Sequence, residues 1–266
     1  MRDSVVRRIR LVLHETKPEA KEVADRVVAG AAARDLEIAT DESVEVDLII
    51  GIGGDGTLLT AASQAIVARA PVVGINLGRV GYLADVEPDQ VDAMLDGLVA
   101  GTLQRSERMT VRATVGAVET LGINDVVLEK VMSQRLVQLR VEINGEYFTT
   151  YRSDGIIVAS PLGSTAYSLS AGGPVLDPSL DALILTPVAP HSLMSRSIVL
   201  APDALITCTV EIDREVRLSV DGRDSGVLAP GSRLTIDRGP RAISFLTLGG
   251  YPFPQPVRHQ FGLDHA

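Results

Sequence analysis

The segment Gly53-Gly54-Asp55-Gly56-Thr57 places one carboxylate among glycines, between an apolar strand-like run and a predicted helix. Glycines let backbone N–H groups approach phosphate oxygens, and a helix N-terminus carries a dipole that favours anions. The spacing therefore predicts that Gly53, Gly54 and Thr57 bind phosphate. A carboxylate is unfavourable there unless it meets Mg²⁺ or accepts a proton from an attacking hydroxyl, so Asp55 is a candidate base. A strand-to-helix turn with Asp55 as N-cap is the alternative interpretation.

A second polar segment runs from Ser160 to Pro174. Its hydroxyl groups lie at Ser160, Ser164, Thr165, Tyr167, Ser168 and Ser170. Neutral hydroxyls both donate and accept hydrogen bonds, which suits recognition of ribose and amide groups better than acid–base work. The segment therefore indicates a sugar-bearing ligand. A short helix whose serines only satisfy its own ends would have the same composition.

The dipeptide Asn124-Asp125 lies between Gly122-Ile123 and the apolar run Val126 to Leu128. An amide beside a carboxylate can bind vicinal ribose hydroxyls, since the carboxylate accepts and the amide does either. We interpret the pair as a candidate ribose site. A plain turn is the alternative.

The elements that must position these motifs follow two periodicities. Over residues 1–105, apolar runs alternate with helical patterns, which predicts consecutive βα units and a Rossmann-like α/β domain that carries the Gly-rich phosphate loop. The strands expected there are Arg8 to Leu13, Asp47 to Ile52 and Val72 to Leu77, and the helices follow Pro18, span Leu58 to Val67 and follow Pro88.

Over residues 106–250 the apolar period changes to two, which predicts an all-β domain. Its strands include Val137 to Ile143, Gly155 to Ala159, Ile206 to Ile212 and Val216 to Val220. Asn144-Gly145 and Asp221-Gly222 are expected as hairpin turns, because these residues accept positive φ at low cost. We expect the tail, residues 251–266, to pack along the surface or return to the first domain.

Composition narrows the class of protein. The 266 residues carry a formal net charge of −9 without basic clusters, which argues against a nucleic acid or a membrane as the main partner. No apolar run reaches the ~20 residues that span a bilayer, and no signal peptide is evident, so we expect a cytoplasmic protein. Cys208 lies in an apolar run and is expected to be buried. The histidines are scattered, so we expect no protein metal cluster.

In this order, the three motifs resemble those of the NAD kinases. Gly74 to Leu83 and Ser219 to Arg223 add two further matches, and the resemblance spans about residues 45–225. It implies an N-terminal α/β domain followed by a C-terminal β-sandwich with the dinucleotide between them, and a homodimer or homotetramer. The implied activity is phosphorylation of the 2′-hydroxyl of the adenosine ribose of NAD, which gives NADP. The donor is ATP or also polyphosphate, with Mg²⁺ or another divalent cation bound with the nucleotide.

The resemblance also implies roles for particular residues. Asp55 corresponds to the proton acceptor, and Gly56 lies beside it against the ligand. Asn124-Asp125 corresponds to the pair that holds the adenosine ribose, where the family more often has Glu second. Arg152 and Asp154 correspond to positions near the nicotinamide ribose. The further implied ligand contacts are Arg135, Thr165, Ala166, Tyr167, Ser168, Leu169, Ser170, Ala189 and Arg223.

One departure from the family pattern and two rival functions remain open at this point. Ser160-Pro161-Leu162-Gly163 replaces the usual Thr-Pro-Thr-Gly run, which removes one hydroxyl. A lipid kinase of the diacylglycerol or sphingosine type has a similar Gly-rich loop, but usually places Asn and Glu almost directly after it. A non-catalytic dinucleotide sensor on the same fold is the other alternative. The sequence leaves the preference between NAD and NADH open, although the charge of Arg152 favours NAD.

Overall fold

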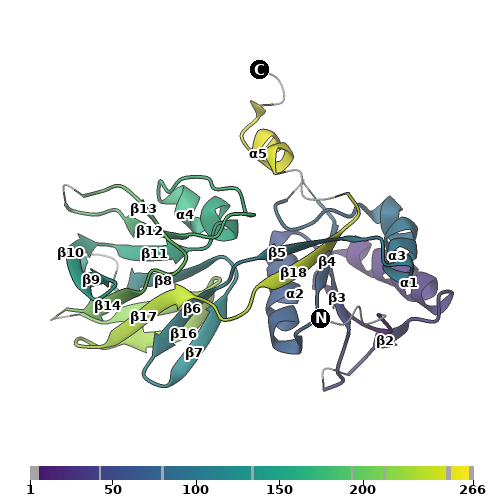
Figure 1. Ribbon diagram of the computed structural model, residues 1–266, viewed down its shortest axis with the longest axis horizontal. Coiled ribbons are helices and arrows are strands. Elements are labelled where there is room, and N and C mark those ends of the chain that lie inside the picture. Colours follow the sequence, from purple (N-terminus) through teal and green to yellow (C-terminus); the bar gives the residue numbers. More distant parts are fainter. Residues whose placement is uncertain are drawn as a thin grey trace. The chain divides into compact units, whose positions relative to one another are not determined.

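The computed structural model describes residues 6–41, 43–78, 81–132, 135–192, 194–211, 214–249 and 253–263, and the chain divides into two compact units. The first unit consists of Met1–Glu107 and Ile243–Ala266, and the second of Arg108–Ala242. Figure 1 shows helices and strands in the first unit and mostly strands in the second.

Within the described residues, the first unit is built on a six-stranded sheet. Parallel pairing joins β1 to β2 and β3, and β4 to β3 and β18. In spatial order its strands are β2 (Glu37–Ala39), β1 (Arg8–Leu13), β3 (Leu48–Gly53), β4 (Val72–Asn76), β18 (Ile243–Thr247) and β5 (Gln104–Arg108). The helices of this unit are α1 (Pro18–Ala32), α2 (Asp55–Ala68), the 3₁₀ turn η1 (Pro88–Gln90), α3 (Val91–Ala100) and α5 (Pro254–Gln260).

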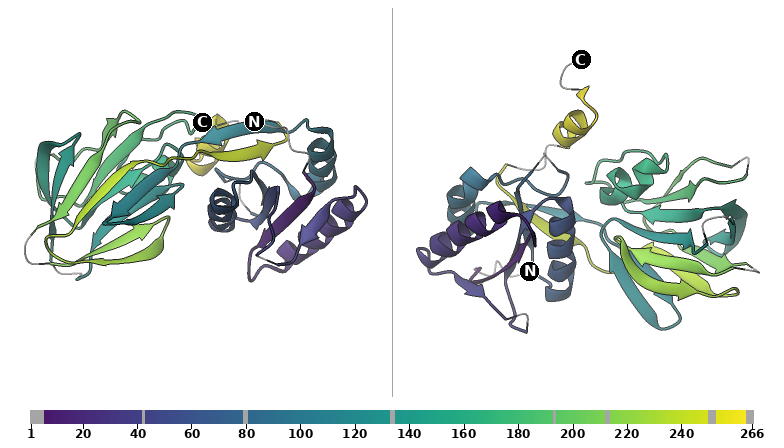
Figure 2. Two further views of the ribbon diagram at one scale, coloured as in Figure 1. Left: turned by 60° about the horizontal axis from the view of Figure 1, so that its bottom comes forward. Right: turned by 180° about the vertical axis from the view of Figure 1, so that it is seen from behind.

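Helices cover both faces of this sheet, because successive side chains of a strand point to opposite sides. Leu48, Ile50 and Ile52 of β3 belong to the core that α1 and α3 complete. Gly51 faces α2 instead, since a Cβ there would lie 2.7 Å from Leu58 Cδ2. Figure 2 shows α1 and α3 on one side of the sheet and α2 on the other. This arrangement confirms the predicted Rossmann-like α/β fold.

The predicted elements of this unit are confirmed with shifted boundaries. The helix after Pro18 is α1, whose buried stripe repeats at three- and four-residue spacing. Helix α2 begins at Asp55 rather than at the predicted Leu58, because its first turn is polar and shows no apolar period. The helix after Pro88 starts as the turn η1 before α3. The short strand β2 was not predicted.

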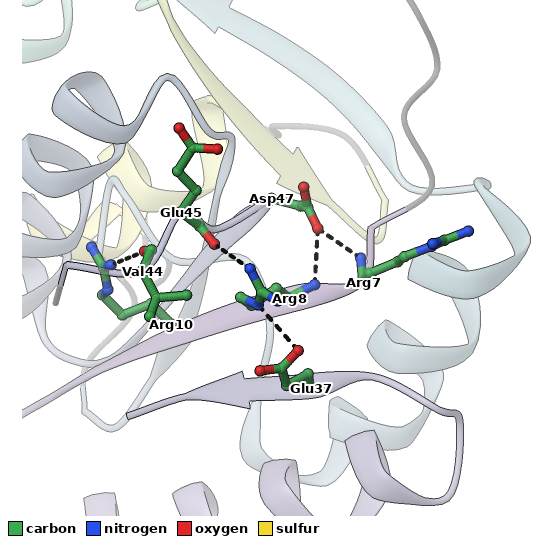
Figure 3. A network of polar contacts seen from close by, with 7 residues as sticks. All are labelled: Arg7, Arg8, Arg10, Glu37, Val44, Glu45 and Asp47. Atoms are coloured by element: carbon green, nitrogen blue, oxygen red, sulfur yellow. Dashed lines mark hydrogen bonds and ion pairs between the residues drawn. The ribbon is translucent and has the colours of Figure 1, made fainter. Parts of the chain in front are cut away.

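Polar contacts fasten the segment before β3 to the edge of the sheet (Figure 3). Asp47 Oδ2 accepts hydrogen bonds from the backbone N–H groups of Arg7 and Arg8, both at 2.9 Å. The Arg8 side chain donates to Glu37 Oε2 on β2 at 3.1 Å and to the backbone oxygen of Glu45 at 3.3 Å. Because Asp47 directly precedes β3, these contacts fix the start of the strand that ends in the Gly-rich loop.

The described part of the second unit contains two six-stranded antiparallel sheets. One sheet has the order β10 (Glu146–Ser153), β9 (Val137–Ile143), β14 (Ile206–Val210), β17 (Arg233–Arg238), β6 (Val111–Val115) and β7 (Val118–Gly122). The other has the order β13 (Ile198–Leu200), β12 (Leu183–Val188), β11 (Gly155–Ala159), β8 (Asp125–Lys130), β15 (Val216–Val220) and β16 (Arg223–Leu228). Two short helical segments, η2 (Leu162–Thr165) and α4 (Tyr167–Ser170), follow β11.

One hydrophobic core lies between these sheets, which confirms the predicted β-sandwich. Cys208 on β14 lies in this core as predicted, and burial raises the pKa of its thiol to about 12. The predicted hairpin turns are also confirmed. Asn144 and Gly145 have φ of 54° and 83°, and Asp221 and Gly222 have φ of 51° and 72°.

The chain returns to the first sheet before residue 250, where the sequence had placed the end of the second domain. Strand β18 (Ile243–Thr247) lies between β4 and β5, so the first unit begins again at Ile243. Helix α5 (Pro254–Gln260) follows in a tail that shows no clear periodicity in sequence. None of the helices in the described part of the chain has the length and apolar character that crossing a bilayer requires.

Candidate functional site

The Gly-rich loop joins β3 to α2 at the carboxyl edge of the parallel sheet. Gly54 is the N-cap of α2 and has an extended backbone, so Asp55, Gly56 and Thr57 form the first helical turn. In open α/β sheets, ligands bind outside the carboxyl ends of the strands. The predicted phosphate loop therefore lies where such folds hold anions.

A pocket of about 420 Å³ opens at this loop. Residues 12–17, from the end of β1 to the start of α1, line one part of it, and residues 54–57 with Thr60 line the other. Lys17 is the one lysine or arginine among the described lining residues. Its Nζ donates a hydrogen bond to the backbone oxygen of Leu77 at 2.9 Å, which holds the ammonium group beside the end of β4. The pocket thus combines a lysine, hydroxyls and a helix N-terminus, which together suit a phosphate anion.

Asp55 is the acidic group of the Gly-rich loop; the residue as a whole is exposed, while its carboxyl group lies against Gly81. Burial against the surrounding protein raises the pKa of its carboxyl group above the ordinary value, while hydrogen bonds from the backbone N–H groups of Tyr82 and Leu83 oppose that rise. A carboxylate with a raised pKa binds a proton more readily. Asp55 therefore has the position and the chemistry of a proton acceptor at the pocket.

The motif Gly74 to Leu83 lies partly outside the described residues, since Arg79 and Val80 are not among them. Its first part forms β4, and its last part includes Gly81, which lies against the carboxylate of Asp55. This motif and the Gly-rich loop therefore meet at one carboxylate.

The second unit holds Asn124-Asp125 at the start of β8. Asp125 is only 4% exposed. Backbone N–H groups of three consecutive residues donate to the carboxylate of Asp221, from Ile123 at 2.8 Å, Asn124 at 2.7 Å and Asp125 at 3.2 Å. Burial, together with the nearby charges of Asp221 and Glu129, raises the pKa of Asp125 to about 7. The sequence identified Asp221 only as a turn residue, because its partners lie about a hundred residues earlier.

The hydroxyl-rich segment packs directly against this pair. Gly163 approaches Asn124 so closely that a Cβ at position 163 would lie 2.0 Å from the backbone oxygen of Asn124. Ser160 Oγ donates to the backbone oxygen of Ile123 at 2.5 Å, and Ser168 Oγ lies 3.0 Å from Thr186 Oγ1. The structure thus brings the two predicted ribose motifs together.

Most hydroxyls of this segment are used inside the protein. Ser160, Ser164 and Ser168 are fully buried. Ser164 Oγ accepts from the backbone N–H of Leu176 at 3.0 Å, and Thr165 Oγ1 donates to the backbone oxygen of Leu162 at 3.3 Å. These contacts match the alternative in which the hydroxyls shape the segment, whereas Ser170 is exposed to solvent.

Two residues on β8 that the sequence did not single out contact predicted site residues. Glu129 Oε1 accepts a hydrogen bond from Tyr167 Oη at 2.5 Å, and burial together with this contact raises the pKa of Tyr167 to about 12. Lys130 Nζ pairs with Asp154 Oδ1 at 2.5 Å. Glu129 and Lys130 are consecutive residues of one strand, and the sequence around them does not indicate which residue either of them contacts.

The remaining predicted residues lie elsewhere in the second unit. Asp154 donates its backbone N–H to Val188 at 3.0 Å, next to Ala189, which is exposed and has a φ of 44°. Arg152 on β10 and Arg223 on β16 are exposed. Arg135 lines a separate pocket of about 260 Å³ with Lys130 and Arg214.

The oxygen groups at the first pocket suit a magnesium ion that arrives with phosphates. Among the described residues, no group of three or more His, Cys, Asp or Glu side chains could hold a metal by itself. Mg²⁺ is commonly held by one or two carboxylates together with substrate phosphates rather than by a protein cage. The carboxylates of Asp55 and Glu15 and the hydroxyl of Thr57 lie in the pocket lining. This donor set fits a nucleotide-borne cation.

Comparison with known families matches both units. Residues 7–103 match the model described as the ATP-NAD kinase N-terminal domain, and residues 123–248 match the ATP-NAD kinase C-terminal domain. The NAD kinase of Symbiobacterium thermophilum is 39% identical over an alignment that covers 94% of this chain and 97% of that protein. The NAD kinase of Desulforamulus reducens is 40% identical, with 85% and 83% covered.

Solved structures give the same comparison. An NAD kinase from Archaeoglobus fulgidus in complex with ATP has a TM-score of 0.77 and 25% identity, covering 96% of this chain and 97% of that one. A yeast NADH kinase complexed with NADH has a TM-score of 0.90 at 22% identity, covering 99% and 90%, which shows a shared fold.

Proposed function

The chain belongs to the NAD kinase family, and on this premise we propose that Asp55 is the proton acceptor of the reaction. The activity is the phosphorylation of NAD to NADP. As the O2′–phosphorus bond forms and the bond from the γ-phosphorus to the β–γ bridging oxygen breaks, the hydroxyl proton passes to the Asp55 carboxylate and ADP leaves. The observation that carries this proposal is the position of Asp55. Its carboxyl group, whose pKa is raised, belongs to the Gly-rich loop that lines the pocket.

The donor phosphates bind in the pocket of the first unit. Backbone N–H groups of the Gly-rich loop, with Gly53, Gly54 and Thr57, contact the phosphate oxygens, and Lys17 supplies a positive charge. In phosphoryl transfer through a loose transition state, alignment and neutralisation of charge account for most of the catalysis. Lys17 is already held by its hydrogen bond to Leu77, so it supplies alignment and positive charge with little further loss of side-chain entropy when phosphate binds.

Mg²⁺ or another divalent cation enters with the nucleotide. When bound, it supplies charge neutralisation at the phosphates. The phosphates provide most of its ligands, and Glu15 and Thr57 are the oxygen groups of the pocket that would complete them.

The acceptor dinucleotide is held by residues of the second unit. Asn124 and Asp125 bind the adenosine ribose, with Asp221 fixing their backbone. In the first unit, Gly56 follows the proton acceptor Asp55 and contacts the ligand. The other proposed contacts are Arg135, Arg152, Asp154, Thr165, Ala166, Tyr167, Ser168, Leu169, Ser170, Ala189 and Arg223.

We also propose a cytoplasmic homodimer or homotetramer that uses ATP and NAD as its small-molecule substrates. The buried free thiol of Cys208 is compatible with a reducing compartment. Light scattering of the purified protein measures the assembly, and a monomer would contradict it. Membership of the NAD kinase family leaves no support for the lipid-kinase alternative.

The test is product formation from purified protein with NAD, Mg²⁺ and either ATP or polyphosphate. We expect NADP with ATP, loss of product when EDTA removes the cation, and recovery when Mg²⁺ is returned. The polyphosphate reaction defines the donor range. NAD binding without product under any of these conditions would contradict a kinase and support a dinucleotide sensor.

A further inference from the structure

We propose that the backbone of residues 81–83 is a clamp that positions the carboxylate of Asp55, and that Gly81 is the residue on which this clamp depends. The inference rests on the proposed role of Asp55 as proton acceptor. It gives the end of the Gly74–Leu83 motif a task in the reaction, as a positioning segment that acts through Asp55.

The contacts at Asp55 are made by main-chain groups. The backbone N–H groups of Tyr82 and Leu83 act on its carboxylate and favour the ionised form. Gly81 lies against the same group, since a Cβ at position 81 would lie 2.2 Å from Asp55 Oδ1, 2.9 Å from Cγ and 3.0 Å from Oδ2. Any side chain at position 81 would therefore displace the carboxylate or the segment.

The clamp is itself fixed to the sheet. Val86 forms a parallel bridge with Ile75, with backbone hydrogen bonds from Val86 to Gly74 at 3.2 Å and from Asn76 to Val86 at 2.8 Å. At Gly74 the segment approaches so closely that a Cβ would lie 2.8 Å from the backbone oxygen of Leu83. Both side chains of the clamp, Tyr82 and Leu83, are buried. The N–H groups are thus held by strand β4 and by packing.

Such a clamp suits a general base. An ionised carboxylate offers about four lone-pair positions, so two N–H donors leave room for a substrate hydroxyl. Backbone donors fix the direction of the carboxylate without the full neutralising charge that a lysine would bring. Fixing a reacting group before the substrate binds removes an entropic cost from the reaction.

The first test is Gly81→Ala beside a matched control. We expect kcat to fall about 10- to 100-fold, with the KM values for ATP and NAD within about threefold, because misplacement of a reacting group affects the transition state more than binding. Gly249→Ala is the control, since a Cβ there would meet no atom within 4 Å, and it should keep wild-type kcat. Wild-type kcat in Gly81→Ala would overturn the clamp.

A double variant separates this inference from the role of Asp55. In an Asp55→Asn background, Gly81→Ala should cause no further loss of kcat, since both changes act on one group. A further tenfold loss in that background would show that Gly81 acts elsewhere and would overturn the clamp. Wild-type turnover in Asp55→Asn alone would instead remove the proposed base.

A second variant adds no Cβ and covers the case in which Gly81→Ala does not fold. Replacing the peptide N–H of Tyr82 by an ester oxygen deletes one donor to Asp55 and leaves every side chain unchanged. Because this N–H acts on the carboxylate of Asp55, its loss should reduce kcat about three- to tenfold and leave the KM values for ATP and NAD within about threefold. An unchanged kcat would overturn the proposal.

Discussion

Asp55 in the first unit and Asp125 in the second are both aspartates with a raised pKa, but their surroundings differ. Asp55 is accessible at a pocket, and the backbone N–H groups of Tyr82 and Leu83 favour its ionised form. Asp125 is 4% exposed, and the charges of Asp221 and Glu129 add to the effect of burial. The same side chain is therefore ready to accept a proton in one unit and tends to keep its own in the other.

The difference shows that a raised pKa alone is a poor guide to chemical role. A proton acceptor must be ionised before the reaction, so N–H donors beside Asp55 favour its function. With a pKa of about 7, Asp125 is protonated in part at neutral pH and can then donate a hydrogen bond as well as accept one. Asp221 has two effects on this part of the fold. It orders the backbone of residues 123–125, and its charge raises the pKa of Asp125.

The largest expected effect is the loss of the Asp221 carboxylate. Asp221→Ala removes the acceptor of three backbone N–H groups and places alanine at a φ of 51°, so we expect a loss of roughly 4 kcal/mol in the free energy of unfolding. Urea unfolding measures it. Asp181→Ala, which breaks an exposed ion pair with Arg238, is the control and should cost less than about 1 kcal/mol. Equal losses in the two variants would contradict the role of Asp221.

A change of intermediate size separates the two aspartates by pH. The pKa of Asp125 is higher in the folded protein than in the unfolded chain, so its contribution to stability is complete below about pH 4 and is lost as pH rises through about 7. Between pH 5 and pH 8, wild type should lose about 3 kcal/mol relative to Asp125→Asn. Asp55→Asn should show a much smaller relative change. The same pH dependence in both variants would remove the distinction.

The smallest expected effect concerns the open pocket. Lys17→Met should raise the KM for ATP about tenfold and leave the KM for NAD unchanged, because a charge-assisted contact to phosphate contributes about 1.5 kcal/mol or more. Lys21→Met is the matched control on the exposed side of α1. Steady-state kinetics, with ATP and NAD varied in turn, measure the two KM values. An equal rise in both KM values would show that Lys17 does not act on the donor.

Sequence periodicity was sufficient for the fold class and for most elements. The strand Arg8–Leu13 and the hairpin turns at Asn144 and Asp221 occur as predicted, because each depends on local residues. Strand β18 was not assigned to the first sheet, since its neighbours β4 and β5 lie far away in sequence. Local patterns carry no information on such pairing.

The candidate site was predictable to a smaller extent. Asp55 stood out because a carboxylate in a glycine loop is unusual, whereas Lys17 became visible only when the β1–α1 loop lay beside that loop. Asp221 and Glu129 were missed for the same reason, as their contacts reach Asn124 and Tyr167 across the chain. The hydroxyl count of the segment 160–170 overstated its free polar groups, because several are used in internal hydrogen bonds.

The most direct measurement compares turnover and NAD affinity in wild type and Asp55→Asn, prepared and assayed side by side. If Asp55 is the proton acceptor, kcat for NADP formation falls about 10²-fold or more, while the Kd for NAD stays within about threefold. Near-normal turnover in Asp55→Asn would contradict the central claim.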